Sequence, residues 1–97
     1  MIRKAYLKRV EATLHEWGDE IAKLGAKADK AEKEAKWIYM EQLALLRAKQ
    51  KVVLERVSKV REAGSGDWGK FKSGVEESLS DLKKALETAI EKLRRIA

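Results

Sequence analysis

Apolar residues recur alternately three and four positions apart through the first half of the chain, which is the spacing of a helix with one apolar face. This first series consists of Leu7, Val10, Leu14, Trp17, Ile21, Leu24, Ala28, Ala31, Ala35 and Ile38. A second series, displaced by one residue, follows as Tyr39, Leu43, Leu46, Gln50, Val53, Val57 and Val60. A displacement of this kind can be absorbed by a change in supercoil without breaking a helix. The pattern therefore predicts one long helix over about residues 2–62.

The segment that joins the two series, residues 24–38, contains none of the residues that mark a turn. It reads LGAKADKAEKEAKWI, without Pro, Asn-Gly or a Ser/Gly cluster. Ala, Lys and Glu are among the residues that helices prefer. Gly25 is the weak point, because Gly costs about 1 kcal/mol against Ala inside a helix. A break near Gly25, which would give a monomeric three-helix bundle, is the alternative to the continuous helix.

The clear turn of the chain lies at residues 63–67, AGSGD. Its predicted residues are Gly64, Ser65 and Gly66, with Gly64 suited to the left-handed position that follows a helix end. After the turn, one apolar face runs through Trp68, Phe71, Val75, Leu79, Leu82, Leu86, Ala89, Leu93 and Ile96. We therefore predict a second helix over about residues 66–96, and an all-α antiparallel hairpin that forms a single domain over residues 1–97.

The unequal lengths of the two predicted helices indicate a dimer. A helix of about 60 residues is about 90 Å long, whereas one of about 30 residues spans about 45 Å. The shorter helix therefore covers only half of the longer one, and the first apolar series lacks a partner within a straight-helix monomer. Two long helices that pair antiparallel, with paired residue numbers summing to 63, would place Leu24 against Tyr39 and Val10 against Val53. We predict a homodimer built as exchanged three-helix bundles, with an interface formed by Leu7, Val10, Leu14, Trp17, Ile21, Leu24, Ala28, Ala31, Ala35, Tyr39, Leu46 and Val53.

A further apolar stripe lies beside the second series, at Trp37, Met40, Ala44 and Ala48. An apolar arc of this width predicts two helical neighbours for the second half of the long helix. We expect Trp37 to contact the second neighbour, with an exposed binding position as the alternative.

The composition excludes several classes of function. The chain has 97 residues, no Cys and a single histidine, His15, so thiolate sites and His clusters are absent. No complete phosphate-binding glycine motif is present. We therefore expect no catalytic residue, metal site, cofactor or small-molecule substrate. No apolar run approaches the ~18 residues of a membrane span, so we expect a cytoplasmic protein. The sequence predicts a non-enzymatic structural or interaction protein that acts through helical self-assembly.

A basic surplus supports a second class of function. The chain carries 22 Lys and Arg against 16 Asp and Glu. Four of these cations, Arg3, Lys4, Lys8 and Arg9, surround Tyr6 and Leu7 near the N-terminus. They oppose the dipole of the predicted helix, and we expect acidic residues near the turn of another chain to relieve this conflict. The alternative is a basic amphipathic module that binds weakly to an anionic membrane or to nucleic acid.

Three segments carry a resemblance to a known family. They are LHEWGDEIAKLGAKADKAEKEAK, the Gly-Ser-Gly-Asp-Trp turn and FKSGVEESLSDLKKALETAIEKL. Together they resemble the small bacterial coiled-coil proteins described as stress-response or uncharacterised proteins, over nearly the whole chain. Gly18 and Gly25 depart from the family pattern, which usually lacks glycine there. The resemblance implies a helical, stress-associated protein without catalytic residues or cofactor.

Overall fold

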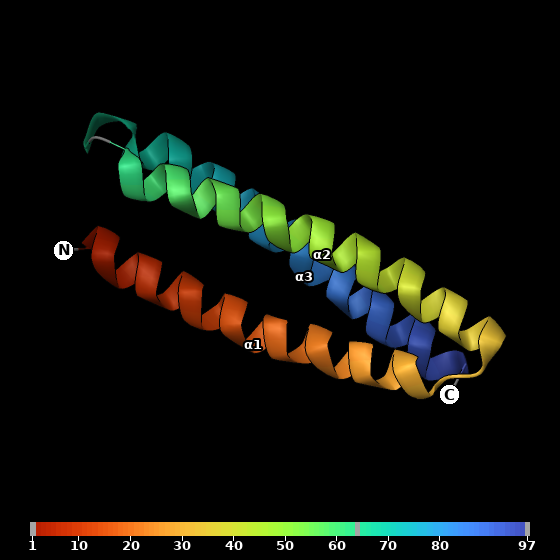
Figure 1. The fold of residues 1–97 in the computed structure, drawn as a ribbon. Coiled ribbons are helices and arrows are strands. Elements are labelled where there is room, and N and C mark those ends of the chain that lie inside the picture. The colour runs from red at the N-terminus through yellow and green to blue at the C-terminus, as the bar shows by residue number, and fades with distance from the viewer. Residues whose placement is uncertain (1, 64, 97) are drawn as a thin grey trace.

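The computed structural model describes residues 2–63 and 65–96, and over these residues the chain forms three antiparallel α-helices (Figure 1). Helix α1 covers Ile2–Lys30, α2 covers Lys33–Glu62 and α3 covers Trp68–Ile96, with a short 3-10 turn, η1 (Ser65–Asp67), before α3. The bundle is elongated, with extents of 51 × 18 × 17 Å. The predicted all-α, three-helix architecture is confirmed.

The long helix predicted over residues 2–62 is interrupted at Ala31 and Glu32. Glu32 has an extended backbone, with φ −73° and ψ 163°, and the chain reverses direction there (Figure 1). The alternative break near Gly25 is also displaced, because Gly25 lies inside α1. Turning back between Lys30 and Lys33 lets both apolar series face one core within a single chain. The one-residue displacement between the series therefore separates two helices and is not absorbed within one.

The core lies between the three helices and is built from both series together with the apolar face of α3. Burial of this apolar surface is the dominant force that holds the bundle together. The most completely buried large side chains are Leu46, Val53, Val60, Val75 and Leu82. Among polar side chains, Gln42 and Ser78 are also buried, and the Ser78 hydroxyl donates to the Val75 carbonyl at 2.9 Å.

The turn between α2 and α3 lies where the sequence predicts it. Helix α2 ends at Glu62, and the predicted turn residues Ser65 and Gly66 belong to η1. Gly64 lies outside the described residues. No described glycine has a positive φ, so the backbone at Gly66 does not depend on the conformational freedom of glycine. From α2, Arg56 donates to the Gly74 carbonyl at 2.8 Å, which joins the two helices next to the turn.

Candidate interaction surfaces

The side of α2 that faces away from the core carries an exposed apolar stripe. Trp37 is 70% exposed, Met40 is 59% exposed and Leu54 is 53% exposed, and Ala44 and Ala48 are exposed between them. Helix α2 has the two helical neighbours that its wide apolar arc predicts, but α1 and α3 cover the side that carries the second series. Trp37 is therefore largely exposed in the single chain and is not buried against a second helical neighbour. Exposed apolar patches of this kind mark interaction surfaces.

A surface groove of about 670 Å³ runs between α1 and α2 next to this stripe. Helix α1 lines it with small residues, Ala22, Gly25 and Ala26, whereas α2 contributes the larger side chain of Met40. A Cβ atom added at Gly25 would meet only the end of the Arg47 side chain, at 3.7 Å. The side chains that line the groove are therefore small on α1 and larger on α2.

Charges of both signs border this groove. Asp29 lies on α1, and Lys36 and Arg47 lie on α2. Within the described part of the chain, none of these three side chains forms an ion pair. The groove thus combines an apolar floor with charges that are available to a partner.

The connector between α1 and α2 consists of only Ala31 and Glu32. The Ala31 amide donates to the Ala28 carbonyl at 3.2 Å, and the Lys36 amide donates to the Glu32 carbonyl at 2.7 Å. The Glu32 side chain makes no capping hydrogen bond to the first turn of α2. This reversal therefore lacks both a turn-forming residue and a side-chain cap.

An aromatic cluster attaches the N-terminal part of α1 to the start of α3. The Tyr6 and Trp68 rings meet edge to face, with centroids 5.4 Å apart and an interplanar angle of 83°. The Lys72 ammonium lies 5.1 Å from the centre of the Tyr6 ring, within the range of a cation–π contact. The apolar series used for the prediction begins at Leu7 and so misses Tyr6. The four-residue spacing of Tyr6, Val10 and Leu14 is the signal that finds it.

The Tyr6 hydroxyl is buried and has no hydrogen-bond partner among the described residues. The pKa of Tyr6 is raised to about 12, mainly by burial and further by the charge of Glu76 and its interaction with the hydroxyl, against a smaller opposite effect of Arg9. The hydroxyl therefore stays neutral at physiological pH, and Glu76 is the nearby group that interacts with it.

The basic N-terminal segment lies beside the α2–α3 turn of its own chain. Arg3 donates to the Arg61 carbonyl at 2.9 Å, and the Arg61 guanidinium pairs with Glu11. The other three cations of the segment, Lys4, Lys8 and Arg9, are exposed. Relief of the helix-dipole conflict by another chain stays a prediction, as does binding of these cations to an anionic surface. None of the described helices is long and apolar enough to cross a membrane.

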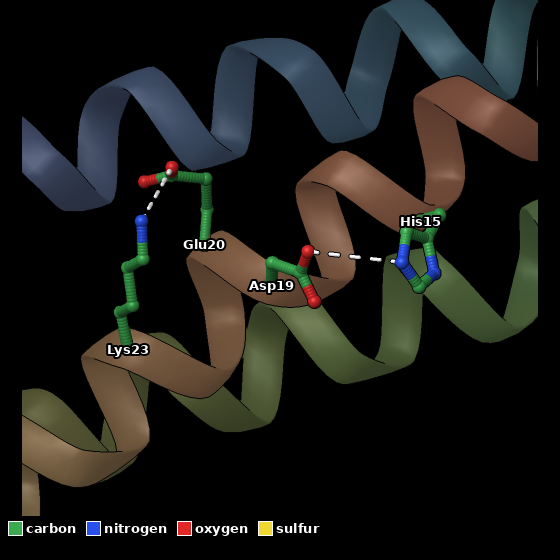
Figure 2. A network of polar contacts seen from close by, with 4 residues as sticks. All are labelled: His15, Asp19, Glu20 and Lys23. Carbon is green, nitrogen blue, oxygen red and sulfur yellow. Dashed lines mark ion pairs between the residues drawn. The ribbon is translucent and has the colours of Figure 1, made fainter.

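Polar side chains of α1 form local pairs (Figure 2). His15 lies 3.8 Å from Asp19, and Lys23 lies 3.6 Å from Glu20. The side chains of the first pair are 82% and 66% exposed, so solvent screens their interaction. Over residues 2–63 and 65–96, no group of three or more His, Asp or Glu side chains could hold a metal ion.

The predicted dimer-interface residues all lie in or beside the core of the single chain. Eight are buried: Val10, Leu14, Ile21, Leu24, Ala28, Tyr39, Leu46 and Val53. The other four, Leu7, Trp17, Ala31 and Ala35, are partly buried. Leu24 and Tyr39, which the predicted register places opposite each other, border the same surface groove within one chain. The pairing predicted between two chains is thus available to α1 and α2 of the same chain.

Comparison of the chain with protein-family models, with curated proteins and with solved structures gives no match.

Proposed function

We propose that this protein is a non-enzymatic interaction protein that acts through helical self-assembly, in which two copies exchange their α1 helices. In the exchanged form, α1 and α2 of each copy join into one straight helix over residues 2–62. Helix α1 of one copy then packs against α2 and α3 of the other. The observation that carries this proposal is the α1–α2 connector, which reverses the chain without a turn-forming residue or a side-chain cap.

Exchange preserves almost every contact of the single chain. The residues of the first apolar series on α1 meet the same partners on α2 whether the two helices belong to one copy or to two. The free energies of the two forms therefore differ mainly at the connector and by the entropy of association.

The connector itself favours the straight form. Ala31 and Glu32 lie within ADKAEKEAK, a run dominated by residues with high helix propensity. Straightening the connector extends the backbone hydrogen bonds of α1 into α2, including amides that the first turn of α2 leaves without helical partners. The remaining cost of exchange is the entropy lost when two copies associate, and this cost falls as the protein concentration rises. Exchange should therefore increase with protein concentration.

The test replaces Lys33, the first residue of α2, with proline. Proline is tolerated at the first position of a helix, and the preceding residue is then restricted to the extended conformation that Glu32 already has. Inside a straight helix, the same proline costs about 3 kcal/mol. An exchanged dimer contains two such helices, so Lys33→Pro should weaken it by about four orders of magnitude in Kd.

Wild-type protein, Lys33→Pro and the control Lys33→Ala are refolded at the same high concentration and then diluted, and their masses are followed by light scattering. We expect dimers that persist on dilution in the wild type and in Lys33→Ala, because separation of exchanged copies requires α1 to detach. Lys33→Pro should form no persistent dimer while keeping its helix content. Persistent dimers of equal amount in Lys33→Pro, or none in the wild type, would refute exchange.

A further inference from the structure

We infer that the face formed by α1 and α2 is a second self-association surface, which binds the same face of another copy. Helix α2 of each copy lies over α1 of the other, and a two-fold axis runs parallel to the helices. This inference goes beyond helix exchange, because it leaves every helix and the connector unchanged. Three properties of the face support it: its shape, its charges and its size.

The shape of the face is complementary to itself in this arrangement. Helix α1 presents small residues at the groove, Ala22 and Ala26 beside Gly25, whereas α2 presents Met40, which is 59% exposed. A two-fold axis parallel to the helices keeps each residue at its own height along the bundle. The raised α2 of one copy therefore comes to lie over the low α1 surface of the other, at the same height.

Contacts inside the chain show how far the long side chains of α2 reach over the glycines of α1. The end of the Arg47 side chain lies 3.7 Å from the position that a Cβ atom at Gly25 would take. The Gln50 side chain lies 3.5 Å from the corresponding position at Gly18. Long side chains of α2 thus already stand beside glycines of α1. Seating α2 of a second copy over α1 therefore covers mainly Ala22 and Ala26, which line the groove beside Gly25.

The charges select this orientation over its alternative. On α1 the groove is bordered by Asp29, and on α2 by Lys36 and Arg47. With α2 over α1, Lys36 of each copy comes close to the level of Asp29 of the other copy, because both residues lie within one to two turns of the α1–α2 connector, and the ion pair occurs twice by symmetry. A two-fold axis across the helices would instead bring α2 against α2, with like charges facing each other. Such repulsion disfavours that orientation.

The face is large enough for a specific dimer. The bundle measures 51 × 18 × 17 Å, and α1 and α2 lie side by side along its long dimension (Figure 1). One long face is therefore comparable with the ~800 Å² per partner of a standard protein interface. A second copy is also the partner that carries both halves of the charge match, Asp29 on α1 and Lys36 on α2.

The experiment measures reversible dimerisation by sedimentation equilibrium, in wild-type monomer fractions and in the Lys33→Pro background, which blocks exchange. Ala26→Arg adds a cation beneath the basic α2 of the second copy, and Ala26 is exposed, so the bundle should keep its helix content. Thr88→Arg adds the same charge to an exposed position of α3 and is the control. We expect Ala26→Arg to raise the Kd of the reversible dimer at least tenfold and Thr88→Arg to change it less than twofold.

The pairing of charges is tested by reversal. Asp29→Lys and Lys36→Glu should each raise the Kd about tenfold, because two symmetric contacts are lost and like charges face each other. The double variant restores opposite charges and should return the Kd to within about threefold of the wild type. A protein that stays monomeric at all accessible concentrations would overturn the inference. So would a reversible dimer that Ala26→Arg leaves unchanged, or reversals that the double variant does not rescue. Failure of exchange alone would leave the reversible dimer intact.

Discussion

Replacing Tyr6 with phenylalanine should stabilise the protein. The substitution removes only the hydroxyl oxygen, which is buried and has no hydrogen-bond partner among the described residues. It keeps the aromatic ring, and with it the edge-to-face contact with Trp68 and the Lys72 ammonium 5.1 Å from the ring centre. The difference between the two proteins therefore isolates the desolvation of one hydroxyl.

The magnitude follows from the cost of an uncompensated buried hydroxyl, which is about 1–3 kcal/mol in protein mutants. Part of this cost is offset where the hydroxyl interacts with the Glu76 carboxylate, which lies near enough to raise the pKa of Tyr6. We therefore expect a gain of about 1 kcal/mol. For a chain of this length, such a gain raises Tm by about 4–8 °C.

The assay is thermal and urea unfolding of wild-type protein, Tyr6→Phe and Tyr39→Phe at neutral pH. Tyr39 is buried to a similar extent, but its side chain borders a surface groove, and its hydroxyl is not among the buried polar atoms that lack a hydrogen-bond partner. The control substitution should change the free energy of unfolding by less than about 0.5 kcal/mol. A loss of 1 kcal/mol or more in Tyr6→Phe would show that the hydroxyl has a stabilising partner, and would refute the reasoning.

The pH dependence gives a second readout of the same group. The pKa of Tyr6 is raised from 10.0 to about 12 in the folded protein. The neutral form is therefore favoured by folding, and this contribution is fully present below pH 10. It is lost as the pH rises from 10 to 12, because the unfolded protein releases the proton first. Wild-type protein should lose stability over this range relative to Tyr6→Phe, which has no hydroxyl to titrate.

Two further substitutions test the core and the connector. Leu46→Ala should lower the free energy of unfolding by about 2–5 kcal/mol in urea titrations, because Leu46 is fully buried. Its neighbour Leu45 is 46% exposed, so the control Leu45→Ala should cost less than about 1 kcal/mol. Equal losses would place the core elsewhere on α2. Glu32→Ser should raise the free energy of unfolding of the monomer by about 0.5–1 kcal/mol, and its Tm accordingly, because serine can cap the first turn of α2 where Glu32 does not. An unchanged Tm would mean that the exposed amides of this turn are satisfied by solvent.

Helix exchange and face pairing together would produce more than a dimer. An exchanged dimer contains two bundles, and each bundle carries one α1–α2 face. Face pairing would therefore link exchanged dimers into open linear assemblies, since each dimer offers two separate faces. Lys33→Pro should limit assembly to the reversible dimer, and Ala26→Arg should limit it to the exchanged one.

The helices themselves were determined by the amino-acid sequence. The two apolar series and the third apolar face predict nearly every buried side chain of the core, because helical periodicity alone decides which residues share a face. The end of α2 at Glu62 follows from the glycines and Ser65 beyond it, which supply local turn chemistry. These features are visible in sequence because they depend on neighbours three or four positions away.

The reversal at Ala31 and Glu32 was decided only by the tertiary structure. Both residues tolerate a helix, so local propensity favours a straight chain, and the gain from turning back comes from long-range burial of α1 against α2 and α3. The burial of Tyr6 depends on Trp68 and Lys72, more than sixty residues away in the chain. The exposure of Trp37 and Met40 was also decided at this level, because the pattern shows that α2 has a wide apolar arc but not which part of it the two neighbouring helices cover.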